Sequence, residues 1–379
     1  MHCSRRSWLA VLALATTLTV TACGDSAGTS KDASESSADA ETVKPAATDR
    51  GWNEGGSFQV PEPAKDAGKG IKIAYTGFGK DNAFAKYTTK AVEDEARKYG
   101  ATATHVGPAT YDPPAQAQLV IDIATAKSYD AIVIQPIDSA SIVPAIKTAV
   151  DAGIKVAAST FVIGPDLTAT SPQVEGVTTE VVEDIVSNIQ SSVDGLAEAC
   201  QGIDPCEVAM IWGVRALAFD AAKIKPFREG IKQHPNIKVV CEADGNYTQD
   251  GGRKVAADCL QAHPNIRAIA SNADQSIRGA EKAIKAAGKT YGLGEDDIVL
   301  MGSYGTKYAV DAVRKGDWLQ TFFARPEAIG RTTVDLLLAS LAGKEVPTYV
   351  NQADLDGVGD VINKAAFEKY PDLRAQWDG

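Results

Sequence analysis

The sequence is poor in histidine and has no zinc-ligand spacing. It contains four histidines and six cysteines among 379 residues. Outside the N-terminal segment, His105, His234 and His263 show no zinc-ligand spacing with the cysteines or with one another. A zinc site needs a compact set of three or four such ligands. The sequence therefore predicts no metal site, and nothing in it calls for a cofactor.

Motifs of catalysis and of nucleic-acid binding are missing as well. There is no Gly-x-Ser-x-Gly elbow, no phosphate-binding loop ending in Lys-Ser/Thr and no dinucleotide fingerprint, and Gly302-Ser-Tyr-Gly305 is a tight turn. The net charge of -11 disfavours binding to nucleic acid, because phosphate would be repelled. We therefore expect neither an enzyme nor a nucleic-acid-binding protein.

Long apolar runs are absent except near the N-terminus. Arg5 and Arg6 precede an apolar run over 8–20, which is shorter than the roughly 20 residues that span a bilayer. We interpret 1–22 as an export signal. The tetrad 20–23 resembles a bacterial lipobox, which predicts acylation of Cys23 and a lipid anchor in the cell membrane. An ordinary cleaved signal and a twin-arginine signal are the alternatives. Residues 23–69 are polar and predict a flexible tether.

Four cysteines remain in the rest of the chain, at positions 200, 206, 241 and 259. An even number of cysteines in an exported protein favours two disulfides. Three connectivities are possible. We favour Cys200 with Cys206 across a helix-to-strand loop, and Cys241 with Cys259 between a strand end and the next helix.

From residue 70 onward, short β-branched runs alternate with amphipathic helical stretches. This pattern predicts parallel sheets covered by helices on both faces, and the length favours two α/β domains. The expected strands are 71–76, 101–106, 131–135, 154–158, 207–212, 237–241, 266–271, 298–302 and 319–323. The expected helices are 83–98, 115–127, 142–152, 181–199, 219–232, 252–262, 275–287 and 327–341.

The loops that follow these strands are the place to seek function, because ligands of open parallel sheets bind beyond the carboxyl ends of the strands. Several residues in these loops also have a purely structural explanation. Asp138 and Asp274 stand where a helix N-cap is expected, and Trp212 and Tyr304 could be core residues. The candidate ligand contacts in these loops are Phe78, Asn82, Phe84, Asp138, Thr160, Phe161, Trp212, Arg215, Tyr247, Asn272, Asp274 and Tyr304.

The order of these landmarks resembles the periplasmic sugar-binding proteins of the ribose-binding type. The resemblance covers residues 70 to about 360. It is carried by Asn82-Ala-Phe84, Gln135-Pro-Ile-Asp-Ser139, Pro226-Phe-Arg-Glu-Gly230, His263-Pro264, the run from Asp274 to Ala280, and Pro326-Glu-Ala-Ile-Gly330.

This resemblance implies two Rossmann-like lobes. The chain would cross from one lobe to the other three times. The crossings are expected near 160–161, 324–325 and 348–351. One lobe would contain 70–160 and 325–346, and the other 161–324 and 347–379. A small ligand would be held between lobes that close by hinge motion. The implied partner is the transmembrane permease of an ABC importer, served by a monomer. A membrane receptor or kinase that senses the ligand is the alternative, and a purely structural surface lipoprotein is a third possibility.

The resemblance also implies which residues hold the ligand, and some of them are changed. Asn82 and Phe84 match the family's contacts, Tyr247 takes the place of a second aromatic platform, and Lys223 replaces an arginine. The family's Asp-Arg pair is replaced by Thr160 and Phe161, its later carboxylate by Tyr304 and its glutamine by Ala324, while a one-residue shift would bring Arg325 into the cleft. Fewer charged contacts predict a largely uncharged ligand, such as a polyol, deoxy-sugar, glycoside or cyclic compound.

Overall fold

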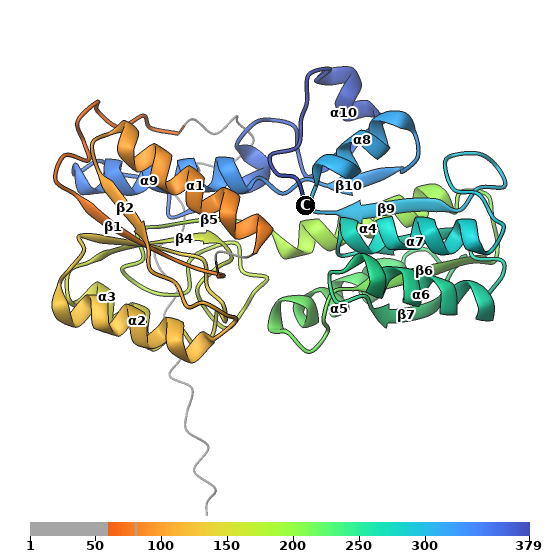
Figure 1. Ribbon diagram of the computed structural model, residues 1–379, viewed down its shortest axis with the longest axis horizontal. Coiled ribbons are helices and arrows are strands. Elements are labelled where there is room, and N and C mark those ends of the chain that lie inside the picture. Colours follow the sequence, from red (N-terminus) through yellow and green to blue (C-terminus); the bar gives the residue numbers. More distant parts are fainter. Residues whose placement is uncertain (1–59, 80–81) are drawn as a thin grey trace, which may run out of the picture. The chain divides into compact units, whose positions relative to one another are not determined.

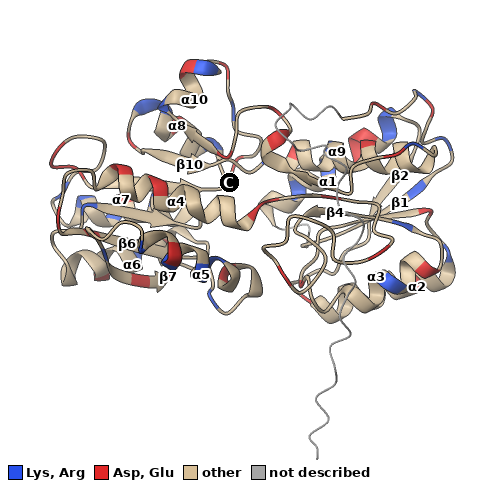
Figure 2. Cartoon of the chain, turned by 180° about the vertical axis from the view of Figure 1, so that it is seen from behind, with Lys and Arg blue, Asp and Glu red and all other residues tan. Residues whose placement is uncertain are grey.

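A computed structural model describes residues 60–79 and 82–379 of the chain. The predicted signal 1–22, the acylated Cys23 and the tether up to residue 59 lie outside these ranges. Within them, no helix has the length and apolar character to cross a membrane. Figure 2 shows basic and acidic residues interspersed along the outer helices.

The first lobe is built on a six-stranded, all-parallel sheet of order β11-β5-β4-β3-β1-β2. Every residue of the β3 run Ala-Ile-Val-Ile is fully buried, because helices cover both faces (Figure 1). Ile132 and Ile134 pack with α2 and α3, and Val133 packs with α1 and α9. The strands are β1 (Lys72–Thr76), β2 (Thr102–His105), β3 (Ala131–Ile134), β4 (Lys155–Thr160), β5 (Thr179–Val182) and β11 (Tyr349–Asn351), and the helices are α1 (Ala83–Lys98), α2 (Pro113–Ala126), α3 (Val143–Asp151) and α9 (Pro326–Leu341).

The second lobe repeats this plan with the sheet order β12-β10-β9-β8-β6-β7, in which only the edge strand β12 is antiparallel among the described strands. Helices α4 and α5 cover one face, and α6, α7 and α8 cover the other. The strands are β6 (Cys206–Trp212), β7 (Ile237–Asp244), β8 (Ala268–Ser271), β9 (Val299–Ser303), β10 (Gln320–Phe322) and β12 (Val361–Asn363), and the helices are α4 (Ile185–Ala199), α5 (Ala218–Ile231), α6 (Gln249–Ala262), α7 (Asp274–Ala286), α8 (Lys307–Lys315) and α10 (Lys364–Lys369).

The first crossing between the lobes lies later in the chain than the sequence predicted. Strand β5 pairs with β4 in the same parallel sheet, so the chain leaves the first lobe only after Val182. The expectation of a crossing near 160–161 is therefore wrong. The predicted helix 181–199 wrongly includes the last two residues of β5. In the structure, α4 begins at Ile185, directly after the N-cap residue Asp184.

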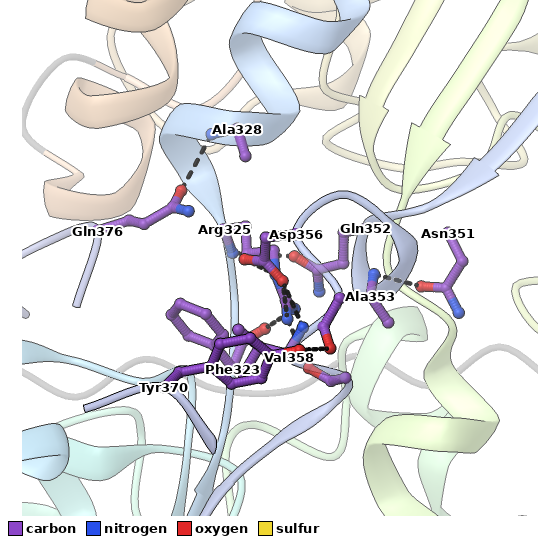
Figure 3. Close-up of polar contacts among 12 residues, drawn as sticks. Phe323, Arg325, Ala328, Asn351, Gln352, Ala353, Asp356, Val358, Tyr370 and Gln376 are labelled. Atoms are coloured by element: carbon purple, nitrogen blue, oxygen red, sulfur yellow. Dashed lines mark hydrogen bonds and ion pairs between the residues drawn. The ribbon is translucent and has the colours of Figure 1, made fainter. Parts of the chain in front are cut away.

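The other two crossings lie side by side and are joined by a buried arginine (Figure 3). Arg325 is completely buried and donates to both carboxylate oxygens of Asp356, at 2.8 and 3.0 Å. Its backbone N–H donates to Gln352 Oε1 at 2.9 Å. Because β11 belongs to the first sheet, the third crossing follows Asn351 and runs through a short 3₁₀ helix, Gln352–Asp354. The first lobe therefore extends beyond the expected end at 346.

Two further expectations about covalent and local structure have clear outcomes. The disulfides Cys200–Cys206 and Cys241–Cys259 are formed, which confirms the favoured connectivity. The prediction that the tether reaches residue 69 is wrong. Val60 packs beside Val350 and Leu336, and Gly68 donates its N–H to the Tyr99 carbonyl at 2.9 Å.

Candidate ligand-binding site

A cavity of about 500 Å³ lies where the carboxyl ends of the two sheets face each other. Loops that follow β1, β2, β3 and β4 supply its first-lobe wall, and loops that follow β6, β7, β8 and β9 supply its second-lobe wall. This placement is the one expected for open parallel sheets. Eight of the predicted ligand residues line it: Phe78, Asn82, Phe84, Asp138, Thr160, Phe161, Tyr247 and Tyr304.

Aromatic rings form much of the wall and contact one another. Phe161 and Phe219 come from opposite lobes, and their ring centroids are 4.5 Å apart. Phe78 lies 6.0 Å from Tyr111 in a stacked arrangement and 6.2 Å from Phe161. Such rings supply a large apolar area, and aromatic faces on a cavity wall can pack against C–H groups of a ligand.

Three wall residues have positive φ angles, which residues other than glycine rarely adopt. The φ angles are +70° at Thr160, +56° at Tyr247 and +97° at Tyr304. Each residue stands at or just after the end of a strand, and its side chain lines the cavity. Strained backbone of this kind costs of order 1–3 kcal/mol and clusters at binding sites, where the surrounding structure enforces it.

A layer of hydrogen bonds behind the second-lobe wall fixes Tyr247. The Tyr247 hydroxyl donates to Asp220 at 2.6 Å, and Asn272 Nδ2 donates to the same buried carboxylate at 3.0 Å. Burial and the Asp220 charge raise the pKa of Tyr247 well above its usual value, so the hydroxyl stays protonated. The Tyr247 ring passes so close to Gly213 that a Cβ there would lie 2.2 Å from it.

A buried ion pair supports the neighbouring part of this wall. Lys223 Nζ lies 3.5 Å from Glu183 Oε1, and both side chains are excluded from solvent. The same ammonium lies 4.0 Å from the centroid of the Phe219 ring and 3.5 Å from the Tyr304 hydroxyl. Burial raises the pKa of Glu183 to about 7, against the opposing pull of Lys223. Lys223 therefore lies behind the aromatic wall and does not line the cavity.

The first-lobe wall has buried polar atoms with no partner within the described structure. Gln135 Nε2 and Thr160 Oγ1 are buried and make no hydrogen bond there, although both residues line the cavity. An unpaired buried donor costs about 1–3 kcal/mol, so a ligand that pairs with it gains affinity. Asp138, whose carboxylate accepts the Ser141 N–H at 2.7 Å, is the one charged side chain among the described lining residues.

Two predicted ligand residues pack or pair outside the cavity. Trp212 is fully buried, packs at 5.3 Å against Phe227, and donates its indole N–H to Glu242 at 3.0 Å. The structure therefore supports the alternative interpretation, in which Trp212 is a core residue. Arg215 lies near the surface in an ion pair with Asp244.

Two other predicted residues are buried and make hydrogen bonds to neighbouring segments outside the cavity. Asp274 is the first residue of α7 and accepts from the Thr306 N–H at 2.7 Å and from the Thr321 hydroxyl at 2.8 Å. Burial raises its pKa to about 7. Arg325 stays in the crossing network of Figure 3. Neither residue lines the cavity, and neither does Asn272, the Asp220 partner described above.

Sequence reasoning missed several wall residues that come from outside the strand-end motifs. Phe219 is the second residue of α5, and Trp377 lies near the end of the sequence. Tyr111 lies in the loop between β2 and α2 and donates to the Ile137 carbonyl at 2.9 Å. Gln135 begins a motif that carries the family resemblance, but the sequence does not predict it as a ligand contact. Within the described residues, no group of three or more histidine, cysteine or acidic side chains is arranged to hold a metal ion.

Residues 73–345 match the family described as periplasmic binding protein domain. Among curated proteins, the chain is 27% identical over 299 residues to a ribose import binding protein of Bacillus subtilis, covering 78% of this chain and 91% of that one. It is 29% identical over 262 residues to a D-allose-binding periplasmic protein of Escherichia coli, covering 68% and 81%.

Solved structures with the same fold include proteins that hold small polyhydroxyl compounds. A solute-binding protein of Actinobacillus succinogenes with bound D-allose has a TM-score of 0.66 and 22% identity, covering 79% of this chain and all of that one. One from Bacillus halodurans with bound myo-inositol also has a TM-score of 0.66, with 21% identity, covering 81% of this chain and 99% of that one.

Proposed function

Because the chain belongs to the periplasmic binding protein domain family, we propose that it is the solute-binding component of an ABC importer and captures a small, largely uncharged polyhydroxyl ligand between its lobes. The matched relatives are named as import or periplasmic binding proteins for ribose, allose and apiose. No enzymatic step is part of the proposal.

The observation that carries the proposal is the pairing of aromatic faces with unpaired buried polar atoms in one cavity. The Phe161 and Phe219 rings offer faces to C–H groups, while Gln135 Nε2 and Thr160 Oγ1 lack partners. A sugar or cyclic polyol has an apolar face and a rim of hydroxyls, so it matches both kinds of surface. A cavity of about 500 Å³ falls in the usual range for small-molecule sites.

The charge distribution disfavours an anionic ligand. Asp138 is the sole charge on the described lining, while Lys223, Glu183 and Asp220 are already paired or bonded behind the wall. A buried anionic ligand would lack a counter-charge in the described lining and would face the Asp138 carboxylate, and burying an unpaired charge is costly. Sugars with phosphate or carboxylate groups therefore fit less well than neutral pentoses, hexoses and polyols.

Delivery to a membrane permease and lipid anchoring at Cys23 complete the proposal. Ligand would stabilise the closed arrangement of the lobes by binding it more tightly, and the permease would recognise that form. Anchoring would keep the protein beside the permease. Mass spectrometry of the exported protein tests the anchor: a diacylated N-terminal cysteine supports it, and an unmodified N-terminus contradicts it.

A thermal-shift screen of the purified protein tests ligand binding. The arms are neutral pentoses and hexoses, polyols, nucleosides, and sugar phosphates at matched concentrations. We expect at least one neutral sugar or polyol to raise the unfolding temperature, because a ligand at 100 times its Kd adds about 2.7 kcal/mol of stability. Stabilisation by a sugar phosphate alone, or by no compound, would overturn the proposal.

A further inference from the structure

The last nine residues of the sequence, 371–379, contact both lobes, and they lie beyond the part of the chain that matches the family. The end of the chain lies between α1 and β9 (Figure 1). We call residues 371–379 the strap.

The strap is fastened to the second lobe through its backbone. Arg314 of α8 donates to the carbonyls of Pro371 and Leu373, at 3.0 and 2.6 Å. The Lys307 N–H donates to the Trp377 carbonyl at 3.0 Å. Arg314 lies in the last turn of α8 and Lys307 is its first residue, so the strap backbone is held at both ends of this helix.

Two side chains of the strap accept hydrogen bonds from the first lobe. The first turn of α9 has no side-chain cap of its own, since the N-cap Arg325 makes no such bond. Gln376 Oε1 accepts the Ala328 N–H at 3.0 Å and so supplies the missing acceptor (Figure 3). Asp378 accepts a hydrogen bond from the Tyr87 hydroxyl of α1 at 2.5 Å.

Between these anchors the strap places Trp377 on the cavity wall. The indole N–H donates to the Tyr304 carbonyl at 2.7 Å, which fixes the ring on the second lobe. Its ring meets Phe84 of the first lobe edge to face at 5.4 Å. Trp377 is 6% exposed and lines the cavity beside both residues.

We propose that the strap completes the ligand site: Trp377 contacts the ligand, and the bonds from Gln376 and Asp378 to the first lobe strengthen the ligand-bound, closed arrangement. This inference rests on the proposed function. Bonds that join the two lobes exist only while the lobes are together, so they and the ligand stabilise the same state. The strap thereby makes affinity depend on residues that follow the segment matched by the family model.

The test of Trp377 uses the ligand identified in the thermal-shift screen. In Trp377→Ala the Kd should rise about tenfold, as expected for loss of one large aromatic contact. Trp377→Phe keeps a ring and guards against a folding defect. The fluorescence test uses a Trp52→Phe background, because Trp52 lies outside the described residues. With excitation selective for tryptophan, fluorescence should change on ligand saturation and the change should disappear when Trp377→Phe is added, because Trp212 and Trp318 are buried away from the cavity.

The bonds from Gln376 and Asp378 to the first lobe, which we call the latch, are tested by combining Gln376→Ala with Asp378→Ala. Two lost hydrogen bonds should raise the Kd about fivefold. The matched control is Arg374→Ala, an exposed position on the same strap, for which we expect no change in Kd.

The outcomes separate the two proposals. If the wild-type protein binds no compound in the screen, the proposed function fails. If the wild type binds, but Trp377→Phe retains the full fluorescence change and Trp377→Ala retains the wild-type Kd, the ligand contact is refuted. An unchanged Kd in the double variant refutes the latch.

Discussion

The two walls of the cavity differ in how their polar groups are satisfied. On the second-lobe wall, the Tyr247 hydroxyl is bonded to Asp220, and the Tyr304 hydroxyl has Lys223 behind it. On the first-lobe wall, Gln135 Nε2 and Thr160 Oγ1 are buried without partners in the described structure. The second lobe therefore presents a braced aromatic surface, and the first lobe keeps polar atoms available to a ligand.

A similar contrast separates two buried carboxylates away from the cavity, Asp274 and Glu180. Asp274 of the second lobe accepts hydrogen bonds from Thr306 and Thr321. Glu180 of β5 in the first lobe accepts one bond, from the Ile163 N–H at 2.9 Å, and its second oxygen has no partner in the described structure. Substituting the hydrogen-bonded carboxylates Asp220 and Asp274 should therefore cost stability, whereas substituting Glu180 should remove a desolvation penalty.

The largest expected effect is in the second lobe. Asp220→Ala removes the acceptor for Tyr247, Asn272 and the Val214 N–H, leaving buried donors unpaired. We expect the free energy of unfolding to fall by about 3 kcal/mol or more, measured by urea denaturation. Asp244→Ala removes a partly exposed ion pair with Arg215 and should cost less than about 1 kcal/mol. Equal losses in the two variants would contradict the bracing role of Asp220.

A smaller, pH-dependent effect is expected in the first lobe. Burial raises the pKa of Glu180 to about 8, above its ordinary value near 4.5. The folded state therefore keeps a proton that the unfolded state loses, and stability from this group is present below pH 4.5 and lost as the pH rises through about 8. Glu180→Gln should be more stable than the wild type by roughly 2 kcal/mol at about pH 6 and by more at pH 8, with little difference at pH 4.5.

Thermal unfolding across this pH range measures the Glu180 effect. The control is Glu175→Gln, an exposed position of the same lobe. A stability difference for Glu180→Gln that does not grow with pH would show that the carboxylate is not penalised by burial.

The smallest effect on stability is expected at Thr160. Thr160→Val keeps the branched shape and removes a buried hydroxyl without a partner, so the apo protein should gain about 1 kcal/mol. Ligand affinity should fall about tenfold if the hydroxyl bonds the ligand. Calorimetric titration together with apo unfolding measures both quantities. Unchanged affinity would remove Thr160 from the site.

The alternating pattern of the sequence was enough to predict most of the fold. Helix α1 lies at the predicted 83–98, because Asn82 caps it and a regular apolar face follows. Strand β5 was missed, since Thr-Glu-Val-Val is short, contains a buried glutamate and runs directly into α4. Strands β11 and β12 have three residues each, too few to show a period.

The site was predictable where it depends on strand ends and not where it depends on long-range packing. Asn82, Thr160 and Tyr304 follow strands, so their place at the cavity could be expected. Trp377 reaches it from a segment far along the chain, through contacts that no local pattern encodes. Trp212 also ends a strand, but its side chain points into the core, and sequence alone does not separate the two directions.

A crystal structure with the ligand found in the screen tests the central claim most directly. The account predicts one molecule in the cavity between the lobes, with a ring face against Phe161, Phe219 or Trp377 and hydroxyls within hydrogen-bonding distance of Gln135 Nε2 and Thr160 Oγ1. A ligand bound elsewhere, or one that leaves both of these atoms unpaired, would contradict it.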